Sequence, residues 1–430
     1  MKIHFIGIGG IGISALARYF LYHKHKVSGS DVSSSEITDD LKKLGAKIFI
    51  GKHKPLNLSQ NVDLVIYSPA VLENNPELKK AKDLNIKCKS YPEALGELTK
   101  KHFTIAVCGS HGKSTTAAMI GLMLTKAKLD PTVIVGTKVK DFGDSNCRVG
   151  NSKYLVIEAD EYKESFLNYS PQIIVLLNIE YDHPDYFKNL NEYINTFKKF
   201  VSHLPPDGIL IANRDDKNTY STFKNRKKVL WYSLKEPKNK ELKKILNIPG
   251  EFNVSNALAA LKVAKILKIP KKISLKALSE YKGSWRRFDE RRVKIGNLML
   301  TIIHDYAHHP TQVKVTLEAA KEKYKNRVIW CIYQPHQYQR TYYLFDDFVR
   351  TFKENNIEKV IITDIYTVAG RESKEIMKKV NSIKLVKAIK KENVIYLPKN
   401  DIISYLKTNL TGSELIIIMG AGDIYDIFSN

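Results

Sequence analysis

Short apolar segments that alternate with helix-forming segments constrain the fold of this chain more than any other feature. Apolar runs of strand length, such as Lys2–Ile6, Phe103–Cys108 and Leu298–His304, are each followed by a glycine-rich or polar turn and then by a helical segment. Strands that alternate with helices form parallel sheets covered by helices. The sequence therefore predicts an α/β protein.

This pattern starts afresh twice within the chain, which predicts three α/β domains. A chain of 430 residues is long enough, since one domain typically uses about 100–200 residues. We place the domain boundaries near residues 98–103 and 282–286. Strands are expected near residues 2–6, 26–29, 47–49, 64–67, 103–108, 132–135, 154–158, 173–178, 208–211, 228–232, 298–304, 328–333, 359–363, 394–396 and 414–419. Helices are expected at residues 13–22, 113–127, 190–202, 252–269, 311–324, 342–354 and 401–406.

Composition excludes several classes of protein. Hydrophobic residues make up 43% of the chain and charged residues 27%, which is the ordinary range for a soluble globular protein. No apolar run approaches the ~18 residues that a membrane span requires. The N-terminus runs from Met1 directly into the first apolar strand, without the pattern of a signal peptide. We therefore expect a cytoplasmic protein without a membrane partner, either a monomer or a homodimer.

The net charge of +24 is the one unusual feature of the composition. A basic chain can bind nucleic acid or acidic ligands. The lysines are spread along the whole length, however, and no nucleic-acid-binding motif accompanies them, so no nucleic-acid partner is expected. The four cysteines are scattered without a CxxC pair, which predicts neither a zinc site nor a disulfide framework: Cys88, Cys108, Cys147 and Cys331.

The first motif, GIGGIG, places Gly7, Gly9, Gly10 and Gly12 between the first strand and the first helix. Glycines at such a turn let the backbone approach a diphosphate, whose charge the helix N-terminus favours. Asp31 ends the second strand, about where an acidic residue that binds ribose belongs. The motif fits a dinucleotide or another nucleotide, and a tight structural turn is the alternative.

The second motif follows an apolar strand and opens a helix, as a phosphate-binding loop does. It comprises Gly109, Ser110, His111, Gly112, Lys113, Ser114 and Thr115. In such a loop, the Lys113 ammonium would neutralise phosphates and the Ser114 hydroxyl would bind Mg²⁺. Val107 stands where the first glycine of the usual motif lies, so the loop is a variant.

Two acidic clusters follow neighbouring strands of the central segment. Glu158 begins the cluster EADEY, and the next cluster, NIEYDH, ends at His183. Residues at the carboxyl ends of parallel strands face the ligand crevice of an α/β sheet. A carboxylate and an imidazole there can complete the coordination of magnesium around ATP phosphates. A solvated turn is the alternative for either cluster alone.

Polar motifs also follow three strands of the last segment. Asp305 and His308 belong to DYAHHP, Arg340 belongs to QPHQYQRT, and a third motif reads TDIY. The paired histidines could bind a metal, but no regular ligand spacing accompanies them. We therefore favour contacts with substrate and nucleotide at these residues.

Taken together, ten motifs appear in a fixed order: GIGGIG, GSHGKST, EADE, NIEYDH, PGEFNVSNALAA, RRFD, DYAHHPT, QPHQYQRT, TDIY and GAGDI. This order resembles that of the Mur ligase family of peptidoglycan synthesis, over nearly the whole chain. The resemblance implies a Rossmann-like UDP-sugar domain over residues 1–99, a central P-loop ATPase domain over 100–283 and a Rossmann-like amino-acid domain over 284–430.

The resemblance also implies ATP-dependent amide synthesis, with UDP-N-acetylmuramate and L-alanine as substrates and with ATP and Mg²⁺ bound. In this chemistry the substrate carboxylate attacks the γ-phosphate, which gives an acyl phosphate and ADP. The amine of the amino acid then attacks the acyl carbon, and phosphate leaves. Phosphorylation is needed because a carboxylate is a poor acyl donor, and the protein contributes positioning and charge neutralisation.

The resemblance implies roles for individual residues. Lys113 matches the phosphate-loop lysine, and the metal ligands match Ser114, Glu158 and His183. The residues that match the family's nucleotide-binding residues are Asn253, Asn256, Arg287 and Asp305. Of these, Arg287 matches the arginine that reaches the phosphates. His308 and Arg340 match positions near the amino acid and the reacting centre. The UDP-sugar contacts match Gly9, Gly10, Gly12, Ser30, Asp31 and Ser68.

Some residues depart from the family pattern. Phe252 stands where a histidine often precedes the first adenine-site asparagine, and Gln337 stands at a position that is frequently basic. Tyr162 is also familiar from a cell-wall recycling member that adds a tripeptide, which is the close alternative. The QPHQYQRT segment favours the alanine-adding member. A nicotinamide dehydrogenase would leave the loop at Lys113 unexplained, and the intact Lys113, Glu158 and His183 argue against a binding protein without activity.

Overall fold

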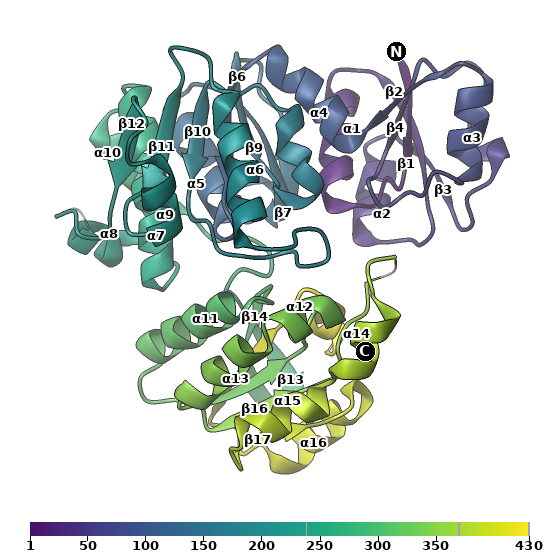
Figure 1. Ribbon diagram of the computed structural model, residues 1–430. Coiled ribbons are helices and arrows are strands. Elements are labelled where there is room, and N and C mark those ends of the chain that lie inside the picture. Colours follow the sequence, from purple (N-terminus) through teal and green to yellow (C-terminus); the bar gives the residue numbers. More distant parts are fainter. Residues whose placement is uncertain (238, 369, 429–430) are drawn as a thin grey trace. The chain divides into compact units, whose positions relative to one another are not determined.

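The computed structural model describes residues 1–237, 239–368 and 370–428. It contains three separate β-sheets with their helices, in an order that follows the sequence (Figure 1). The expectation of a three-domain α/β protein is therefore confirmed. The precise boundaries after residues 99 and 283 stay a prediction.

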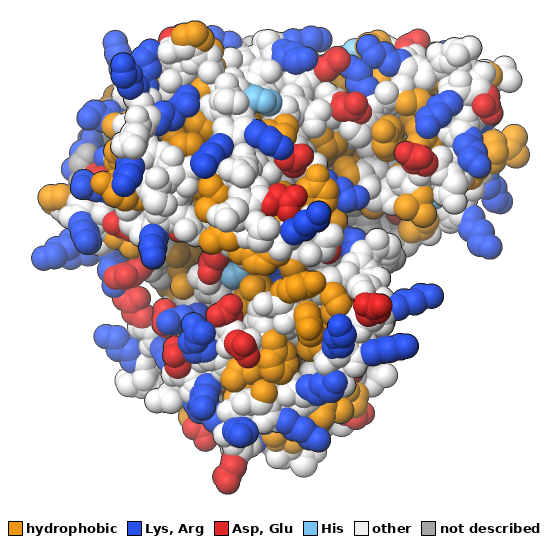
Figure 2. Space-filling view, viewed as in Figure 1, with side chains coloured by type: hydrophobic (Ala, Val, Ile, Leu, Met, Phe, Trp, Pro, Cys, Tyr) orange, Lys and Arg blue, Asp and Glu red, His pale blue; other side chains and the backbone are white. Residues whose placement is uncertain are grey.

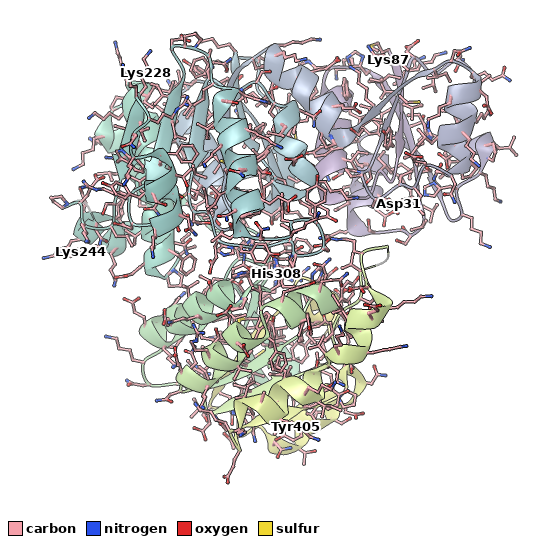
Figure 3. All side chains as sticks on the ribbon, viewed as in Figure 1. Asp31, Lys87, Lys228, Lys244, His308 and Tyr405 are labelled. Carbon is pink, nitrogen blue, oxygen red and sulfur yellow. The ribbon has the colours of Figure 1, made fainter. Side chains whose placement is uncertain are left out.

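The N-terminal domain is built on a five-stranded sheet of order β3-β2-β1-β4-β5, and every neighbouring pair is parallel. Its strands are β1 (Lys2–Ile6), β2 (Lys26–Asp31), β3 (Lys47–Ile50), β4 (Leu64–Tyr67) and β5 (Lys87–Ser90). Its helices are α1 (Ile11–Tyr22), α2 (Glu36–Lys43), α3 (Pro76–Asp83) and α4 (Tyr91–Lys100). Asp31 and Lys87 lie at opposite ends of this sheet, as a carboxyl end and an amino end of parallel strands should (Figure 3).

The central domain has a seven-stranded sheet of order β12-β11-β10-β6-β9-β7-β8, which is parallel except for the pair β7 and β8. Its strands are β6 (Phe103–Cys108), β7 (Thr132–Val139), β8 (Ser145–Arg148), β9 (Tyr154–Glu158), β10 (Ile173–Leu176), β11 (Ile209–Asn213) and β12 (Val229–Tyr232). Its helices are α5 (Lys113–Lys126), α6 (Leu190–Ser202), α7 (Lys217–Phe223), α8 (Asn239–Ile245), α9 (Glu251–Ile266) and α10 (Lys271–Glu280).

The C-terminal domain has a six-stranded sheet of order β13-β14-β18-β15-β16-β17, in which only β13 and β14 pair antiparallel. Its strands are β13 (Asp289–Ile295), β14 (Leu298–Asp305), β15 (Val328–Tyr333), β16 (Lys359–Ile362), β17 (Val394–Tyr396) and β18 (Glu414–Met419). Its helices are α11 (Pro310–Lys323), α12 (Tyr338–Tyr343), α13 (Phe345–Glu354), α14 (Lys374–Lys379), α15 (Ser382–Ile389) and α16 (Ile402–Asn409).

Both faces of the C-terminal sheet are buried, because successive side chains of a strand point to opposite faces. In β18, Leu415 and Ile417 join one apolar core, while Ile416 and Ile418 join the other. The first core packs under α11, α13 and α15, and the second packs under α16 (Figure 1). This burial explains why the central strands read as continuous apolar runs.

The structure corrects and extends the list of expected elements. Eight α-helices of the described residues were not expected, namely α2, α3, α4, α7, α8, α10, α14 and α15. The expected helix over residues 342–354 is two helices, α12 and α13, which meet at Leu344. The helix expected to reach residue 269 ends at Ile266. Three strands were not expected, namely β5, β8 and β13. None of the helices in the described residues is both long and apolar enough to cross a membrane.

Contacts divide the chain into two compact units. The first unit comprises Met1–Ile179, Asn195–Glu236 and Asn256–Tyr281. The second comprises Glu180–Ile194, Pro237–Ser255 and the described chain from Lys282 onward. On the face seen in Figure 2, Lys and Arg side chains are scattered among acidic and uncharged ones, as the spread of lysines along the sequence predicts.

A buried carboxylate organises the polar interior of the N-terminal domain. Glu77 is 0% exposed and accepts hydrogen bonds from His4 Nε2 at 2.8 Å and Ser30 Oγ at 2.7 Å. His53 Nδ1 at 3.0 Å and Asn57 Nδ2 at 2.8 Å bind its other oxygen. Burial alone raises the pKa of Glu77, but these hydrogen bonds outweigh burial and lower the pKa to about 2.

This network predicts a pH-dependent contribution to stability. Because the pKa of folded Glu77 lies below its ordinary value of 4.5, the stabilisation is present above about pH 4.5 and is lost as the pH falls toward about 2. Glu77→Gln should lower the free energy of unfolding by about 3 kcal/mol at pH 7. Urea unfolding at several pH values measures this, with exposed Glu73→Gln as the control. A gap between wild type and Glu77→Gln that stays constant down to pH 3 would contradict the assignment.

Candidate active site

The loop between β6 and α5 has the shape of a phosphate-binding loop. Gly109 and Gly112 have φ values of +131° and +87°, in the left-handed region where glycine is favoured. Asn178, at the end of neighbouring β10, braces the loop: its Oδ1 accepts from His111 N at 2.8 Å and its backbone oxygen accepts from Ser110 N at 3.2 Å. The predicted loop residues therefore lie together at the carboxyl end of the central sheet.

Lys113 is held at the start of α5 by a buried acidic partner. Its Nζ lies 2.8 Å and 3.1 Å from the two carboxylate oxygens of Glu161, and it donates to Gly109 O at 2.8 Å. Glu161 is 0% exposed. Burial alone lowers the pKa of Lys113, but the charges of Glu161, Asp160 and Glu158 outweigh burial and raise it. The ammonium is therefore charged at neutral pH, and a phosphate bound in the loop would compete with Glu161 for it.

Ser114 and Glu158 come together as the sequence predicts. Ser114 Oγ donates to Glu158 Oε2 at 2.8 Å, and Gly136 N donates to the same oxygen at 2.7 Å. A hydroxyl and a carboxylate are hard oxygen donors of the kind that Mg²⁺ prefers, so these two residues fit the ion. His183, the third predicted ligand, belongs to the second unit.

His183 has a constrained conformation within the second unit. Its φ is +56°, and its backbone N–H donates to Asp182 Oδ1 at 2.7 Å. Its Nδ1 lies 3.5 Å from Arg371 Nη2, and Arg371 Nε donates to Asp185 Oδ2 at 2.7 Å. Residues other than glycine rarely adopt a left-handed backbone conformation. Where the surrounding structure holds such a residue in place, as it does His183, the residue often belongs to a functional site.

The two predicted asparagines lie one turn apart on α9. Asn256 approaches Gly112 so closely that a Cβ on that glycine would lie 2.5 Å from Asn256 Oδ1. Asn253 Nδ2 donates to Pro249 O at 2.6 Å. Asn256 is thus adjacent to the phosphate loop, whereas the described contact of Asn253 fixes the start of its own helix.

The glycine turn of the N-terminal domain packs closely against predicted substrate residues. Gly9 N donates to Asp31 Oδ2 at 2.8 Å, and a Cβ on Gly7 would lie 3.0 Å from Ser68 Cβ. Asp31 therefore stabilises the turn itself. Ser30 is buried and bound to Glu77, so its side chain supports the turn from the interior.

In the C-terminal domain, the predicted nucleotide residues surround the end of β14. Asp305 is buried and accepts from Phe288 N and Ala307 N, each at 2.8 Å, and burial raises its pKa. The Arg287 guanidinium lies 5.0 Å from the ring centre of Tyr306. The adjacent Arg286 is buried and stacks 4.1 Å from the ring centre of Tyr425. Arg286 also donates to Gly422 O at 3.2 Å, which ties the GAGD loop to this region.

His308 follows the carboxyl end of β14 (Figure 3). Its Nδ1 lies 2.9 Å from Tyr306 O. Because a carbonyl oxygen only accepts, Nδ1 carries the proton and Nε2 keeps its lone pair. Burial, reinforced by the charge of Arg340, lowers the pKa of His308 well below its usual value. His308 is therefore a neutral imidazole at pH 7, and its Nε2 accepts no hydrogen bond from the described residues.

Arg340 forms a buried ion pair with Asp182. Arg340 is 2% exposed, and its Nε donates to Asp182 Oδ1 at 2.9 Å. Its Nη1 donates to Gln337 Oε1 at 3.1 Å and to His336 O at 3.2 Å. Within the described residues, Nη2 makes no hydrogen bond, so this nitrogen can bind an added carboxylate. Burial alone raises the pKa of Asp182, but Arg340 outweighs burial and holds it well below its usual value.

Four residues of the site were not assigned a role from the sequence. Glu161 binds Lys113, Asn178 braces the phosphate loop, Asp182 pairs with Arg340 and Arg286 holds the GAGD loop. All four lie inside motifs that the sequence analysis quoted. Their position at strand ends was a usable signal, but the choice of partner depends on side-chain packing that a sequence motif does not contain.

A phosphate loop with a charged lysine, on the mostly parallel sheet of the second of three α/β domains, defines a class of protein that uses nucleotide phosphates. Models of three Mur ligase domains match the chain. "Mur ligase family, catalytic domain" matches residues 2–103, "Mur ligase middle domain" matches 107–264 and "Mur ligase, glutamate ligase domain" matches 286–422. The chain therefore belongs to the Mur ligase family, a family of ATP-dependent ligases.

Individual relatives agree with this family. The UDP-N-acetylmuramate–L-alanine ligase of Clostridium tetani is 42% identical in an alignment of 450 positions that covers 99% of this chain and 96% of the relative. That of Acetivibrio thermocellus is 41% identical, over 99% of this chain and 94% of the relative.

Among solved structures, the UDP-N-acetylmuramate-alanine ligase of Thermotoga maritima is similar with a TM-score of 0.81 and 27% identity, over 100% of this chain and 97% of that one. A murein peptide ligase from Psychrobacter arcticus has a TM-score of 0.72 at 24% identity, over 100% and 97%, and shares the fold.

Proposed function

We propose that the chain joins L-alanine to UDP-N-acetylmuramate with conversion of ATP to ADP and phosphate, in the synthesis of peptidoglycan precursors. The observation that carries this proposal is the likeness, about 40% identical over 99% of the chain, to relatives named for that reaction. The reaction proceeds through an acyl phosphate, since a free carboxylate is a poor acyl donor. We place the enzyme in the cytoplasm, as a monomer or a homodimer, without nucleic-acid or membrane partners.

In the first half-reaction, the substrate carboxylate attacks the γ-phosphate of ATP. The loop from Gly109 to Thr115 holds the phosphates with its backbone N–H groups, and Lys113 neutralises the charge on the transferred group. Glu161 keeps Lys113 charged and aimed across the loop. Asn253, Asn256 and Asp305 contact the nucleotide, and Arg287 contacts its phosphates.

Ser114, Glu158 and His183 would hold Mg²⁺. When bound, this ion supplies charge neutralisation between the phosphate groups. The oxygens of Ser114 and Glu158 already share one hydrogen bond of 2.8 Å, which supports their common role. The negative charge of Glu158 also favours a cation at this place.

In the second half-reaction, the amine of L-alanine attacks the acyl carbon and phosphate leaves. An ammonium cannot attack, so a base must take its proton. His308 is neutral and its Nε2 keeps a lone pair, which suits it to this step. Arg340 presents Nη2 for the carboxylate of the amino acid, while its other nitrogens are held in place.

The UDP-sugar lies against the N-terminal glycine turn. Gly9, Gly10 and Gly12 let the backbone approach the diphosphate, whose charge the N-terminus of α1 favours. Asp31 and Ser30 shape the turn, and Ser68 lies beside Gly7. These contacts fix one end of the substrate, and its carboxylate is then directed toward the phosphate loop.

A panel of acceptors tests the proposal. Phosphate release should require ATP, UDP-N-acetylmuramate and L-alanine together, with serine and glycine as weaker acceptors, because a methylene contributes only ~1–3 kcal/mol of discrimination. The related tripeptide-adding reaction is tested with L-alanyl-γ-D-glutamyl-meso-diaminopimelate. Release that depends on this tripeptide, with no response to free L-alanine, would replace the proposed function with the recycling reaction.

A further inference from the structure

Tyr91 is the first residue of α4 and lies beside the glycine turn. A capping box fixes the start of this helix, in which Ser90 N donates to Glu93 Oε2 at 2.7 Å. A Cβ on Gly12 would lie 3.1 Å from Tyr91 Cζ and 3.3 Å from its hydroxyl oxygen. The phenol therefore occupies the space over Gly12, and the lack of a side chain at residue 12 is what lets it approach α1.

The Tyr91 hydroxyl has no assigned role inside the protein. Among the described residues, none forms a hydrogen bond with it, although the side chain is only partly exposed. The hydroxyl is therefore available as a hydrogen-bond donor to a bound ligand. A phenol hydroxyl beside the glycine turn, without an acceptor among the described residues, points to a bound group with acceptor oxygens.

The surroundings of Tyr91 tell which protonation state it has. Burial raises its pKa most, and the nearby charges of Glu158 and Asp160 raise it further. The phenol is therefore protonated throughout the physiological range and acts as a hydrogen-bond donor.

We infer that the Tyr91 hydroxyl donates a hydrogen bond to the diphosphate of the UDP-sugar substrate and so positions that substrate for phosphorylation. This inference rests on the proposed function and adds a positioning residue to it. Gly12 lies where α1 begins, and within the described residues the backbone N–H groups of Ile11, Gly12 and Ile13 have no hydrogen-bond acceptor. The phenol adds a side-chain donor next to these backbone groups, since its oxygen would lie 3.3 Å from a Cβ on Gly12.

Tyr91→Phe tests the inference, because it removes only the hydroxyl and leaves the ring over Gly12. The KM for UDP-N-acetylmuramate should rise about 10- to 100-fold, as expected for loss of a hydrogen bond to a charged group. The KM values for ATP and L-alanine and the kcat should stay within about twofold. Tyr154→Phe is the matched control, because that hydroxyl likewise has no hydrogen-bond partner among the described residues and lies at the amino end of β9.

Binding without turnover separates this inference from the proposed function. In calorimetry, Tyr91→Phe should weaken binding of UDP about 10-fold or more and leave binding of uridine, which lacks the diphosphate, unchanged. Equal affinity of wild type and Tyr91→Phe for UDP would overturn the role of Tyr91, even if the wild type is an active ligase. A fall in kcat with unchanged KM values would also overturn it, since the hydroxyl would then act at the reacting centre. A wild type that binds UDP but releases no phosphate with L-alanine would refute only the proposed function.

Discussion

A Lys113→Ala variant should release phosphate at least about 10³-fold more slowly than wild type and should also be less stable by about 3–5 kcal/mol. The loss of rate follows because this ammonium is the fixed positive charge of the phosphate loop. The loss of stability follows because Glu161, which is 0% exposed, would lose the cation that balances its buried charge. Phosphate release and urea unfolding measure the two effects.

A double variant separates these effects. Glu161→Gln removes the buried charge, so Lys113→Ala with Glu161→Gln should recover most of the lost stability and none of the activity. Recovery of phosphate release in the double variant would show that Lys113 serves the fold alone. A single Lys113→Ala variant with wild-type stability would contradict the buried ion pair.

Replacing Arg340 with methionine should lower the free energy of unfolding by about 3–5 kcal/mol, because Asp182 would lose its partner inside the protein. Met keeps much of the apolar volume of the side chain and removes the charge. We also expect a large loss of turnover, since the guanidinium is proposed to hold the amino acid. The measurements are urea unfolding and the KM for L-alanine, which should rise more than the KM for ATP.

The double variant Arg340→Met with Asp182→Asn is the control for this prediction. It should be more stable than Arg340→Met by about 2 kcal/mol or more, since the unpaired charge is gone. Turnover should stay low in both. Additive losses of stability in the double variant would mean that the two side chains do not depend on each other.

The parallel sheets could be predicted because their strands are buried on both faces. Such strands read as continuous apolar runs, as Leu415–Met419 does. The three missed strands are short or polar, with the sequences KCKS, SNCR and DERRVKI. They lie at the edges of their sheets, where pairing with a neighbouring strand, rather than an apolar pattern, makes them extended.

The positions of the site residues could be predicted better than their partners. Motif order placed Lys113 in a phosphate loop and Ser114 with Glu158, and the structure brings the latter two together. The roles of these residues in catalysis stay a prediction. Glu161 and Asp182 could not be singled out, because a cluster of several acids does not tell which carboxylate is buried against which cation.

The central claim is that the phosphate loop primes a substrate carboxylate by phosphorylation. It is tested most directly with UDP-N-acetylmuramate that carries ¹⁸O in both oxygens of its carboxylate. If the acyl phosphate forms, one of these oxygens leaves with the phosphate, so mass spectrometry should find one ¹⁸O in each phosphate released during synthesis of the alanine amide. Amide formation with unlabelled phosphate would contradict the account.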